Sequence, residues 1–532
     1  MAPTISSPRP AAVSRGVTTP ASAASTAAGA ALERRWWWTV FALCTLMGVT
    51  WALSTPLMTG PDEASHALRA AAVARGQLVG GAGRPVQGFK NILVPVDVPG
   101  AYASAGAVGA CFMGTPRTGS LRFQVPGARP PCPPFRGPDH EVSVLTQEYR
   151  GQPSYYAAVG AVTLVFSGAT GAYAMRLVSA LLSAALLASA LVSARRLPRP
   201  TLAGIGVLAA ATPVVFYLSG SVNTSSLEIA AAIGLWAAGL LVVRGSGLLA
   251  GRDIARAGLA FVVLALTRGL GPAFAVSIAA ALGVLAGRKR LQRLVRRRDV
   301  RIWVAAAIAS LVASAAWLLS IQSAYPLSDR PSGLAHALGL QPFFLEQTVG
   351  VFGPNDTVLP AGLDLVWAAA VVLLLVALVG YGRPVERGVV ATVLVGALVL
   401  QVSAEGLSIP PIGYAWQGRY TMPLLVGVPV LCGGLVGGRG RSGPPVRLER
   451  WARWAGAGLV AVQAIAFWSV LRHHAGHGRA EQGLVGALFD PRWRPPLLPP
   501  VAYLVGYVAL CGVLTGLVLR SNLRRAPSAA PR

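Results

Sequence analysis

Long apolar runs restrict the fold of this chain more than any other sequence feature. A membrane-spanning helix needs about 20 apolar residues, and about 12 runs approach that length. We therefore expect an all-α, polytopic membrane protein with about 12 transmembrane helices. The runs at 256–268 and 270–287 are short and share one turn. The predicted spans are 36–57, 174–194, 201–219, 224–244, 256–268, 270–287, 302–321, 361–381, 388–405, 420–438, 452–470 and 499–520.

Composition excludes the other broad classes of protein. The chain is 54% hydrophobic and 12% charged, whereas a soluble globular protein carries about 25% charged residues. Abundant apolar residues exclude disorder for most of the chain. Its 5 cysteines in 532 residues are too few for a disulfide-built scaffold.

The arginines predict the orientation of the bundle. Lys and Arg gather in cytoplasmic loops of membrane proteins, and the basic segments here alternate along the chain so that both termini lie inside. This pattern accounts for the net charge of +27 without nucleic acid, and it makes 288–301 a cytoplasmic flank beside anionic lipid. The expected organisation is a disordered cytoplasmic N-terminus (1–35), a membrane domain (36–520) with a large outer loop (58–173), and a cytoplasmic tail (521–532).

The outer loop 58–173 contains two further expected features. Cys111 and Cys132 both lie in it, and an outward-facing compartment permits a disulfide between them. The apolar stretch 155–168 is too short to cross a membrane, so we expect an interfacial or re-entrant helix.

The stretch 60–69 could carry acid–base chemistry. If Pro61 occupies the first position of a helix, then Asp62, His66 and Arg69 fall on one helical face. A carboxylate there can take a proton from a hydroxyl, and His or Arg can hold it or bind a phosphate. The alternative is that Asp62 and Glu63 only complement the helix dipole.

Other polar groups lie at or near the outer ends of spans. Arg419, with Gln417 and Tyr420, is either a phosphate clamp or an interfacial anchor. Glu228, about a turn inside an apolar run that Asn223 opens, is either functional or a wet carboxylate at a capped helix start. Arg268 needs an anionic partner or snorkels to lipid headgroups, and Asp356 binds substrate or only makes a turn.

No common cofactor signature is present. The sequence lacks a GxxxxGK[ST] phosphate loop, an HExxH motif and a CxxC pair. The sequence therefore identifies no certain cofactor, and a bound divalent cation is possible.

Four stretches together resemble a bacterial family of multi-spanning proteins that carries a domain of unknown function. They are Gly60-Pro61-Asp62-Glu63-x-x-His66, the Pro-x-Tyr-Tyr at 153–156, the turn at 352–360, and Gln417-Gly418-Arg419-Tyr420. Their order agrees with that family over nearly the whole chain. Ser154 and Ala64 depart from it, since proline is usual at both positions.

That family in turn resembles the C-type glycosyltransferases, membrane enzymes that use polyprenyl-phosphate-linked sugars. The resemblance implies that Asp62 is the general base and that Glu63 is an assisting acid or a cation contact, with His66 beside them. Position and chemistry match Arg419 and Arg268 to the donor phosphate. The full set of expected substrate-binding residues is Arg69, Tyr155, Asn223, Glu228, Arg268, Asp356, Gln417, Arg419 and Tyr420.

The expected function is transfer of a sugar from a polyprenyl-phosphate donor to an envelope acceptor, with inversion, on the outer face of the bacterial cytoplasmic membrane. The alternative is a non-enzymatic transporter or flippase of a polyprenyl-linked glycan or envelope lipid, and a third possibility is an accessory subunit without chemistry. Polar groups that cluster at one face favour surface chemistry over passage.

Overall fold

Helices dominate the computed structural model. It describes residues 20–81, 84–85, 92–114, 132–245, 249–321, 333–412, 416–436, 446–476 and 483–520. The predicted tail 521–532 and the first 19 residues of the predicted N-terminal segment lie outside these residues.

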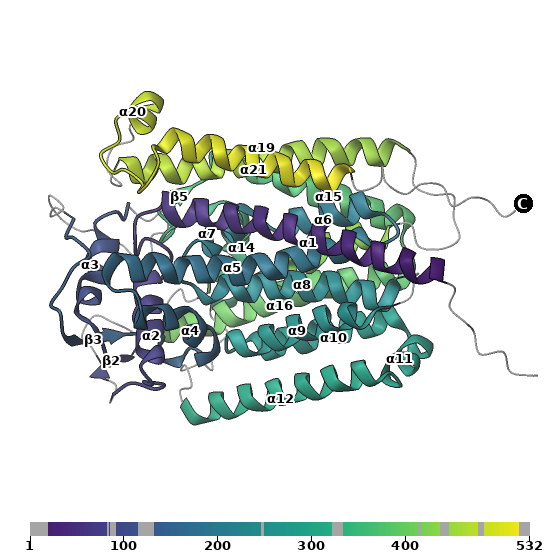
Figure 1. Ribbon diagram of the computed structural model, residues 1–532, viewed down its shortest axis with the longest axis horizontal. Helices are drawn as coiled ribbons and strands as arrows, with labels where there is room; N and C mark the ends of the chain where they lie inside the picture. Colours follow the sequence, from purple (N-terminus) through teal and green to yellow (C-terminus); the bar gives the residue numbers. More distant parts are fainter. Residues whose placement is uncertain are drawn as a thin grey trace, which may run out of the picture.

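Among the described residues, 8 helices are long and apolar enough to cross a membrane, or up to 10 if each of two bent pairs is one span. The predicted all-α, polytopic class is confirmed. In Figure 1 the long helices run side by side along the long axis. The 8 helices are α1 (Pro20–Ser54), α5 (Gly168–Arg195), α8 (Thr224–Arg244), α12 (Arg298–Ile321), α15 (Leu363–Tyr381), α16 (Pro384–Ile412), α19 (Val446–Ala475) and α21 (Pro500–Leu519).

The remaining predicted spans are helical but broken or short. Helices α6 (Pro200–Ala210) and α7 (Pro213–Ser219) meet at 62°, because Pro213 cannot continue the helix before it. Helices α10 (Gly271–Ala286) and α11 (Arg288–Val295) meet at 114° at Gly287, whose φ is 70°. The shorter segments are α9 (Gly251–Thr267), α17 (Met422–Leu425) and α18 (Gly427–Leu435). The predicted count of about 12 spans is therefore near the 8 to 10 candidate spans of the described residues but not exact.

Helix α1 extends further toward the N-terminus than expected. It begins at Pro20, so 20–35 is helical where disorder was predicted. The reason is the alanine-rich sequence that precedes the apolar run, since alanine has the highest intrinsic helix propensity.

The predicted outer loop 58–173 folds into a small α/β cap at one end of the bundle (Figure 1). Its three-stranded antiparallel sheet has the order β1-β2-β3, and Val96 faces Val144 across the central pair. This sheet was not expected from the sequence. The cap contains α2 (Glu63–Ala74), β1 (Arg84–Pro85), β2 (Ile92–Pro99), η1 (Gly100–Ser104), α3 (Ala105–Ala110), β3 (Glu141–Thr146), η2 (Glu148–Arg150), α4 (Pro153–Gly160) and η3 (Ala161–Leu164).

Two features of the cap correspond to expected ones. Cys111 and Cys132 form a disulfide with their Cα atoms 5.4 Å apart. The apolar stretch after Tyr155 forms the short helices α4 and η3, and at their end Val165 is 78% exposed. Such a tip fits the expected interfacial segment.

Short elements also connect the later helices. They comprise α13 (Leu334–Gly339), α14 (Gln341–Val349), the hairpin β4 (Val351–Phe352) and β5 (Thr357–Val358), the turn η5 (Gly418–Tyr420) and α20 (Leu484–Phe489). Of these, β5 and α20 lie at the cap end of the bundle in Figure 1.

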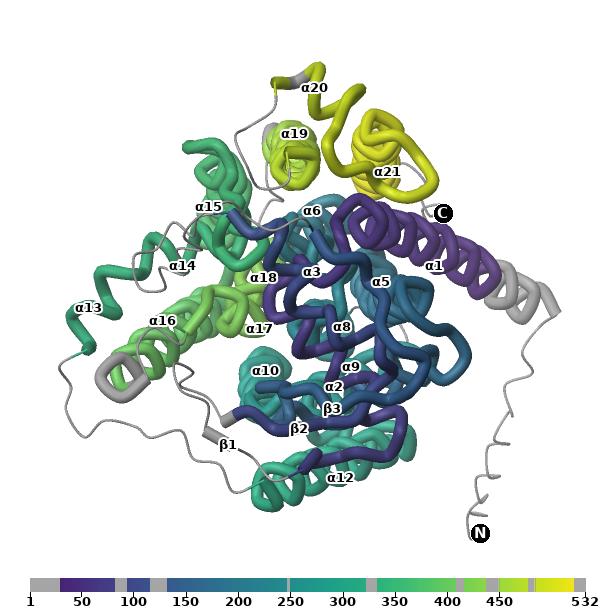
Figure 2. The backbone as a smooth tube through the Cα atoms, turned by 90° about the vertical axis from the view of Figure 1, so that its left-hand side faces the viewer, coloured from purple at the N-terminus to yellow at the C-terminus, as the bar shows by residue number. Residues whose placement is uncertain are grey.

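Helix α8 forms the centre of the bundle, as the end-on view in Figure 2 shows. Its most apolar stretch is completely buried. Small residues let neighbouring helices approach closely: a Cβ on Gly433 of α18 would lie 2.3 Å from the carbonyl oxygen of Leu202 in α6. Such close approach is typical of helix packing in membranes. The rigid packing beneath the cap fixes the ends of the helices that carry the polar site.

Candidate functional site

The site centres on a contact between two residues that are 357 positions apart. Arg419 Nη2 donates a hydrogen bond to Asp62 Oδ2 at 2.5 Å. The Arg419 side chain is 6% exposed and that of Asp62 is 32% exposed. The segment after α1 and the entry to α17 therefore bring a carboxylate and a guanidinium together at the cap end of the bundle.

The backbone at Asp62 directs its side chain toward Arg419. Asp62 is the N-cap of α2 with φ 57° and ψ 13°, in the left-handed region, and its side chain does not cap the helix. Aspartate tolerates this conformation better than most residues. Helix α2 begins at Glu63, so the expected first helical position of Pro61 is wrong. The left-handed cap rotates Asp62 out of the helical series, and its carboxylate remains available to partners from elsewhere in the fold.

The environment keeps the Asp62 carboxylate ionised. Burial alone raises its pKa. The positive charge of Arg419, with smaller effects from His66 and Arg268, outweighs burial and lowers the pKa below the ordinary value.

A second guanidinium lies next to this pair. Arg268 Cζ is 4.0 Å from the centre of the Tyr420 ring, and Arg419 Cζ is 5.2 Å from the same centre. Arg268 also donates to Ser225 Oγ at 3.2 Å. Two cations thus share one phenol ring, an arrangement that attracts an anion.

Glu228 lies behind the arginines and is fully buried. The expectation that it could remain wet is therefore wrong. Its carboxylate is 3.6 Å from Arg268 Nη1, and neither of its oxygens has a hydrogen-bond partner among the described residues. It offsets part of the positive charge of Arg268.

Arg419 has donors to spare. Within the described part of the chain, its Nε and Nη1 atoms are buried without a hydrogen-bond partner, while Nη2 donates to Asp62 and Tyr420. A guanidinium presents five N–H donors. The unused ones can bind an incoming anion while the contact with Asp62 persists.

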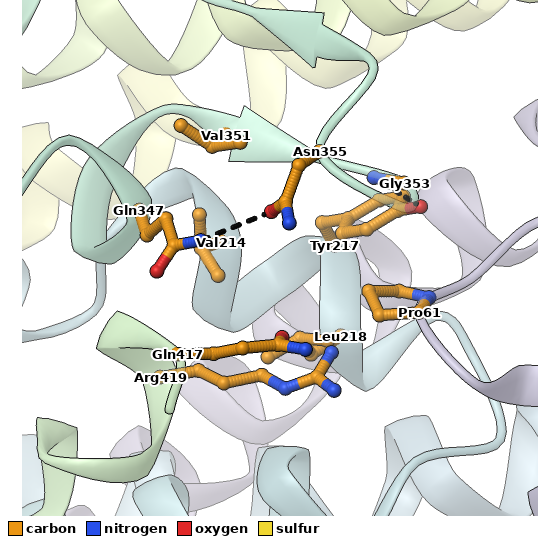
Figure 3. Close-up of a pocket in the computed structure, with 10 residues that line it drawn as sticks. All are labelled: Pro61, Val214, Tyr217, Leu218, Gln347, Val351, Gly353, Asn355, Gln417 and Arg419. Carbon is orange, nitrogen blue, oxygen red and sulfur yellow. Dashed lines mark hydrogen bonds between the residues drawn. The ribbon is translucent and has the colours of Figure 1, made fainter. Parts of the chain in front are cut away.

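Beside Arg419 lies a pocket rich in amide side chains, which we call the amide pocket. It encloses about 300 Å³ of space free of protein atoms, counting its open mouth. Figure 3 shows Gln417 and Arg419 running in the same direction across from Gln347 and Asn355. Its lining residues are Pro61, Val214, Tyr217, Leu218, Gln347, Val351, Gly353, Asn355, Gln417 and Arg419.

Glu63 has a different environment from its neighbour Asp62. Its side chain is 1% exposed and forms a double hydrogen bond with Arg176, 2.7 Å at each contact. The same oxygens accept from the amides of Gly60 and Val222. The expected roles of Glu63 as an assisting acid or a cation contact therefore do not fit, because its oxygens are already occupied. Glu63 instead positions the loop that carries Asp62.

His66 and Arg69 also lack the expected joint face with Asp62. His66 Nδ1 is 2.8 Å from Tyr156 Oη. Burial lowers the pKa of His66, and the opposing charges of Glu148 and Asp62 only partly offset this, so the ring is neutral at pH 7. Arg69 is buried and donates to the carbonyls of Gln77, Leu78 and Gly151, which makes it a scaffold of the cap and not a substrate contact.

Three other expected substrate-binding residues have internal partners. Tyr155 Oη accepts from the backbone amide of Asn223, and the Asn223 side chain caps α8 and donates to the Pro61 carbonyl at 2.7 Å. Asp356 accepts from the Gly114 amide at 2.8 Å and lies 3.6 Å from His473. None of the three joins the Asp62–Arg419 pair directly, although Asn223 supports the segment before Asp62.

Five residues near the site were not among the expected ones: Tyr156, Arg176, Tyr217, Gln347 and Asn355. An arginine inside an apolar run is a functional signal by default, and this could have identified Arg176. The turn at 352–360 was singled out in the sequence, but neither its Asn355 nor Gln347 was expected to line a pocket, because that role depends on tertiary packing. Across the described residues, no group of three or more His, Cys, Asp or Glu could hold a metal ion.

Comparison with known proteins gives one family and two distant structures. A family model described as "Predicted membrane protein (DUF2142)" matches residues 44–428. A search of curated proteins found no match. ArnT from Cupriavidus metallidurans in the apo state is 14% identical, with a TM-score of 0.42 over 91% of this chain and 77% of that one. Its structure bound to undecaprenyl phosphate is 13% identical, with a TM-score of 0.44 over 92% and 78%. Such low scores carry no argument about what this chain binds.

Proposed function

The chain belongs to the DUF2142 family of predicted membrane proteins, and we propose that it transfers a sugar from a polyprenyl-phosphate donor to an envelope acceptor at the outer face of the membrane. The observation that carries this proposal is the ionised Asp62 held beside Arg419 and Arg268. A base next to two cations suits a reaction that removes a proton and releases a phosphate.

The two arginines form the phosphate site. Arg419 supplies its unpartnered Nε and Nη1 donors, and Arg268 supplies a second positive charge across the Tyr420 ring. Guanidinium groups match phosphate oxygens in pairs. Because Arg419 keeps Nη2 on Asp62, phosphate binding also fixes the distance between leaving group and base.

The chemical step follows from this arrangement. Asp62 takes the proton of an acceptor hydroxyl, whose oxygen forms a bond to the anomeric carbon of the donor sugar. The bond from that carbon to the phosphate oxygen breaks, and its electron pair leaves on polyprenyl phosphate, which the arginines stabilise. Attack opposite the leaving group inverts the anomeric centre, and phosphate needs no proton to depart.

The distribution of charge along α8 favours transfer at one face over passage through the bundle. After Glu228, the next charged residue of α8 is Arg244, and the segment between them is apolar and almost wholly buried. A pathway for a polar glycan through the centre would need polar groups at depth. This observation favours the transferase over the transporter.

Deletion of the gene provides the first test. Cells that lack the protein should accumulate one polyprenyl-phosphate sugar and lose the matching envelope glycan, as mass spectrometry of lipid and glycan extracts would show. Complementation with the wild type should reverse both changes, and complementation with Asp62→Asn should reverse neither. Unchanged carrier lipids in the deletion strain would contradict the proposal.

A further inference from the structure

We infer that the amide pocket holds the transferred sugar and that this sugar is a single uncharged ring. The inference rests on the proposed function and adds to it the class of the donor. Its geometric basis is that Arg419 belongs to both places: it contacts Asp62 and also lines the pocket.

The pocket opens next to the reacting groups. Pro61, which immediately precedes Asp62, forms part of its wall. Arg419 is 5% exposed, and its Nε and Nη1 lack partners among the residues that the structure describes. A phosphate bound to these donors places the group attached to it at the pocket and near the Asp62 carboxylate.

Uncommitted amides form the polar wall. Gln347 donates to Asn355 Oδ1 at 3.1 Å and accepts from the Gly418 amide, so it orients Asn355. The Asn355 Nδ2 group and the side-chain amide of Gln417 have no hydrogen-bond partner within the described ranges. Amides donate and accept, as sugar hydroxyls do, so each can pair with a ring hydroxyl.

The charge of the wall selects against ionised sugars. Among the described residues that line the pocket, Arg419 is the one that carries a charge. Its contacts are taken by Asp62 and, in the complex, by the phosphate. An ammonium group would find no carboxylate in the lining, and a carboxylate would find only neutral amides. Burial of an unpaired charge is costly.

The size of the pocket limits the ligand to one ring. Even with its open mouth counted, the free space is about 300 Å³, so a second sugar ring would project into solvent. Asn355 projects from a tight turn at φ 65°, and Gly353 of the same turn is at φ 60°. A turn fixed in this way between β4 and β5 presents its amide with little freedom to adapt to a larger ligand.

Binding of lipid-linked sugars to the full-length protein in nanodiscs tests the inference. The probes are bare polyprenyl phosphate and the same carrier bearing a neutral hexose, a uronic acid or an amino sugar. We expect the hexose carrier to bind about tenfold more tightly than the bare carrier, the gain of a few hydrogen bonds to neutral partners. The two charged sugars should give no such gain.

Two variants localise the effect. Gln417→Leu removes an amide at similar volume, and Asn355→Gly removes one while keeping a residue suited to φ 65°. Each should abolish the hexose gain and leave binding of the bare carrier unchanged. Thr348→Val, at a half-buried position of α14 that does not line the pocket, is the matched control and should keep the gain. The thermal unfolding midpoint of each variant verifies folding.

The outcomes separate the inference from the proposed function. If wild type does not bind bare polyprenyl phosphate, or Arg268→Gln leaves that binding unchanged, the proposed function fails and the sugar site fails with it. If the bare carrier binds as expected but the hexose adds nothing, a charged sugar binds more tightly, or Gln417→Leu weakens both carriers equally, only the inference about the pocket is overturned.

Discussion

Arg419 connects every part of the site. It neutralises Asp62, shares the Tyr420 ring with Arg268 and lines the amide pocket. Its planar fork makes these contacts in different directions at once, which a lysine cannot do. The chemistry of the site therefore depends on one side chain more than on any other.

Replacement of Asp62 tests the proposed base. Asp62→Asn keeps the size of the side chain and the tolerance of a left-handed backbone, but it removes the proton acceptor. We expect sugar transfer to fall by a factor of about 10²–10⁴, with an unchanged unfolding midpoint. Asp139→Asn, at an exposed position of the cap, is the control and should retain activity. Full transfer by Asp62→Asn would remove Asp62 from the mechanism.

The pH dependence of transfer reports the Asp62–Arg419 pair. Because the pKa of Asp62 is lowered, its base form persists until the pH falls below the ordinary aspartate value, about 3.9. Between about pH 4 and 7 we expect no loss of kcat/KM from Asp62. Arg419→Gln removes the main positive charge that opposes the effect of burial on Asp62. Burial then raises the pKa of Asp62, and the loss of kcat/KM at acidic pH begins at a higher pH. Arg419→Lys keeps the positive charge, so its loss of kcat/KM should begin at a pH as low as in the wild type. Identical pH profiles of kcat/KM in the wild type and both variants would contradict this account.

At the residue scale the sequence predicts part of the site. The stretches 60–66 and 417–420 predict that Asp62 and Arg419 lie close together, since both stretches lie at predicted outer ends of apolar runs. The sequence does not distinguish Asp62 from Glu63, because their directions depend on the φ of Asp62, 57°. Nor does the sequence show that Arg69 donates its hydrogen bonds to backbone carbonyls, because only the folded cap brings these carbonyls to it.

At the scale of elements, the Glu63–Arg176 pair joins the cap to the bundle. Arg176 of α5 also donates to the carbonyls of Ala52, Thr55 and Pro56 at the end of α1. The pair therefore fixes α2 on α1 and α5, and it holds the segment that presents Asp62.

Removal of one partner should destabilise the protein strongly. Glu63→Ala leaves a buried guanidinium without its carboxylate, which costs about 3–5 kcal/mol. The free energy of unfolding in mixed micelles measures this. Glu141→Ala breaks the exposed pair with Arg75 and should cost at most about 1 kcal/mol. A loss for Glu63→Ala no larger than that of the control would show that the pair does not hold the cap.

The disulfide should stabilise the cap. Cys111 and Cys132 are 21 residues apart, and closing a loop of that size contributes about 3 kcal/mol. A reductant should lower the unfolding midpoint of the wild type. It should leave the midpoint of the Cys111→Ser/Cys132→Ser variant unchanged, because that variant has no disulfide to reduce, and this midpoint should already be low. If both proteins had the same midpoint with and without the reductant, the estimate would be contradicted.

Apolar length predicts where the helices are, but it does not predict where they break. The break before Pro213 follows from proline chemistry. The predicted span 270–287 also ends at Gly287, where a φ of 70° stops helix α10, but apolar length does not predict the 114° angle to α11. The strands of the cap are hidden by their glycine- and proline-rich surroundings and by pairing across a long connection between β2 and β3.

At the scale of the whole molecule, the candidate site and the basic helix α11 lie at opposite ends of the bundle. The cap and the site occupy one end of the bundle, and the basic helix α11 lies at the other (Figure 1). This separation agrees with the predicted orientation, in which 288–301 is cytoplasmic.

Cysteine labelling tests that orientation. The three cysteines outside the disulfide are buried, which gives a low background. Asp139→Cys in the cap should react with a membrane-impermeant maleimide on intact spheroplasts. Lys289→Cys in α11 should react only after permeabilisation. Both positions are exposed in the fold, and the predicted orientation places them on opposite sides of the membrane. The reverse pattern would place the site in the cytoplasm.

The distance of 357 residues between Asp62 and its partner also has a consequence for biosynthesis. Ribosomes add about 5–20 residues per second, so Asp62 leaves the ribosome roughly 20–70 s before Arg419. A nascent chain arrested at any earlier point has an aspartate without its arginine, so the proposed phosphate site and base are incomplete in it. Competence thus arrives late in synthesis, after most of the hydrophobic scaffold has been inserted.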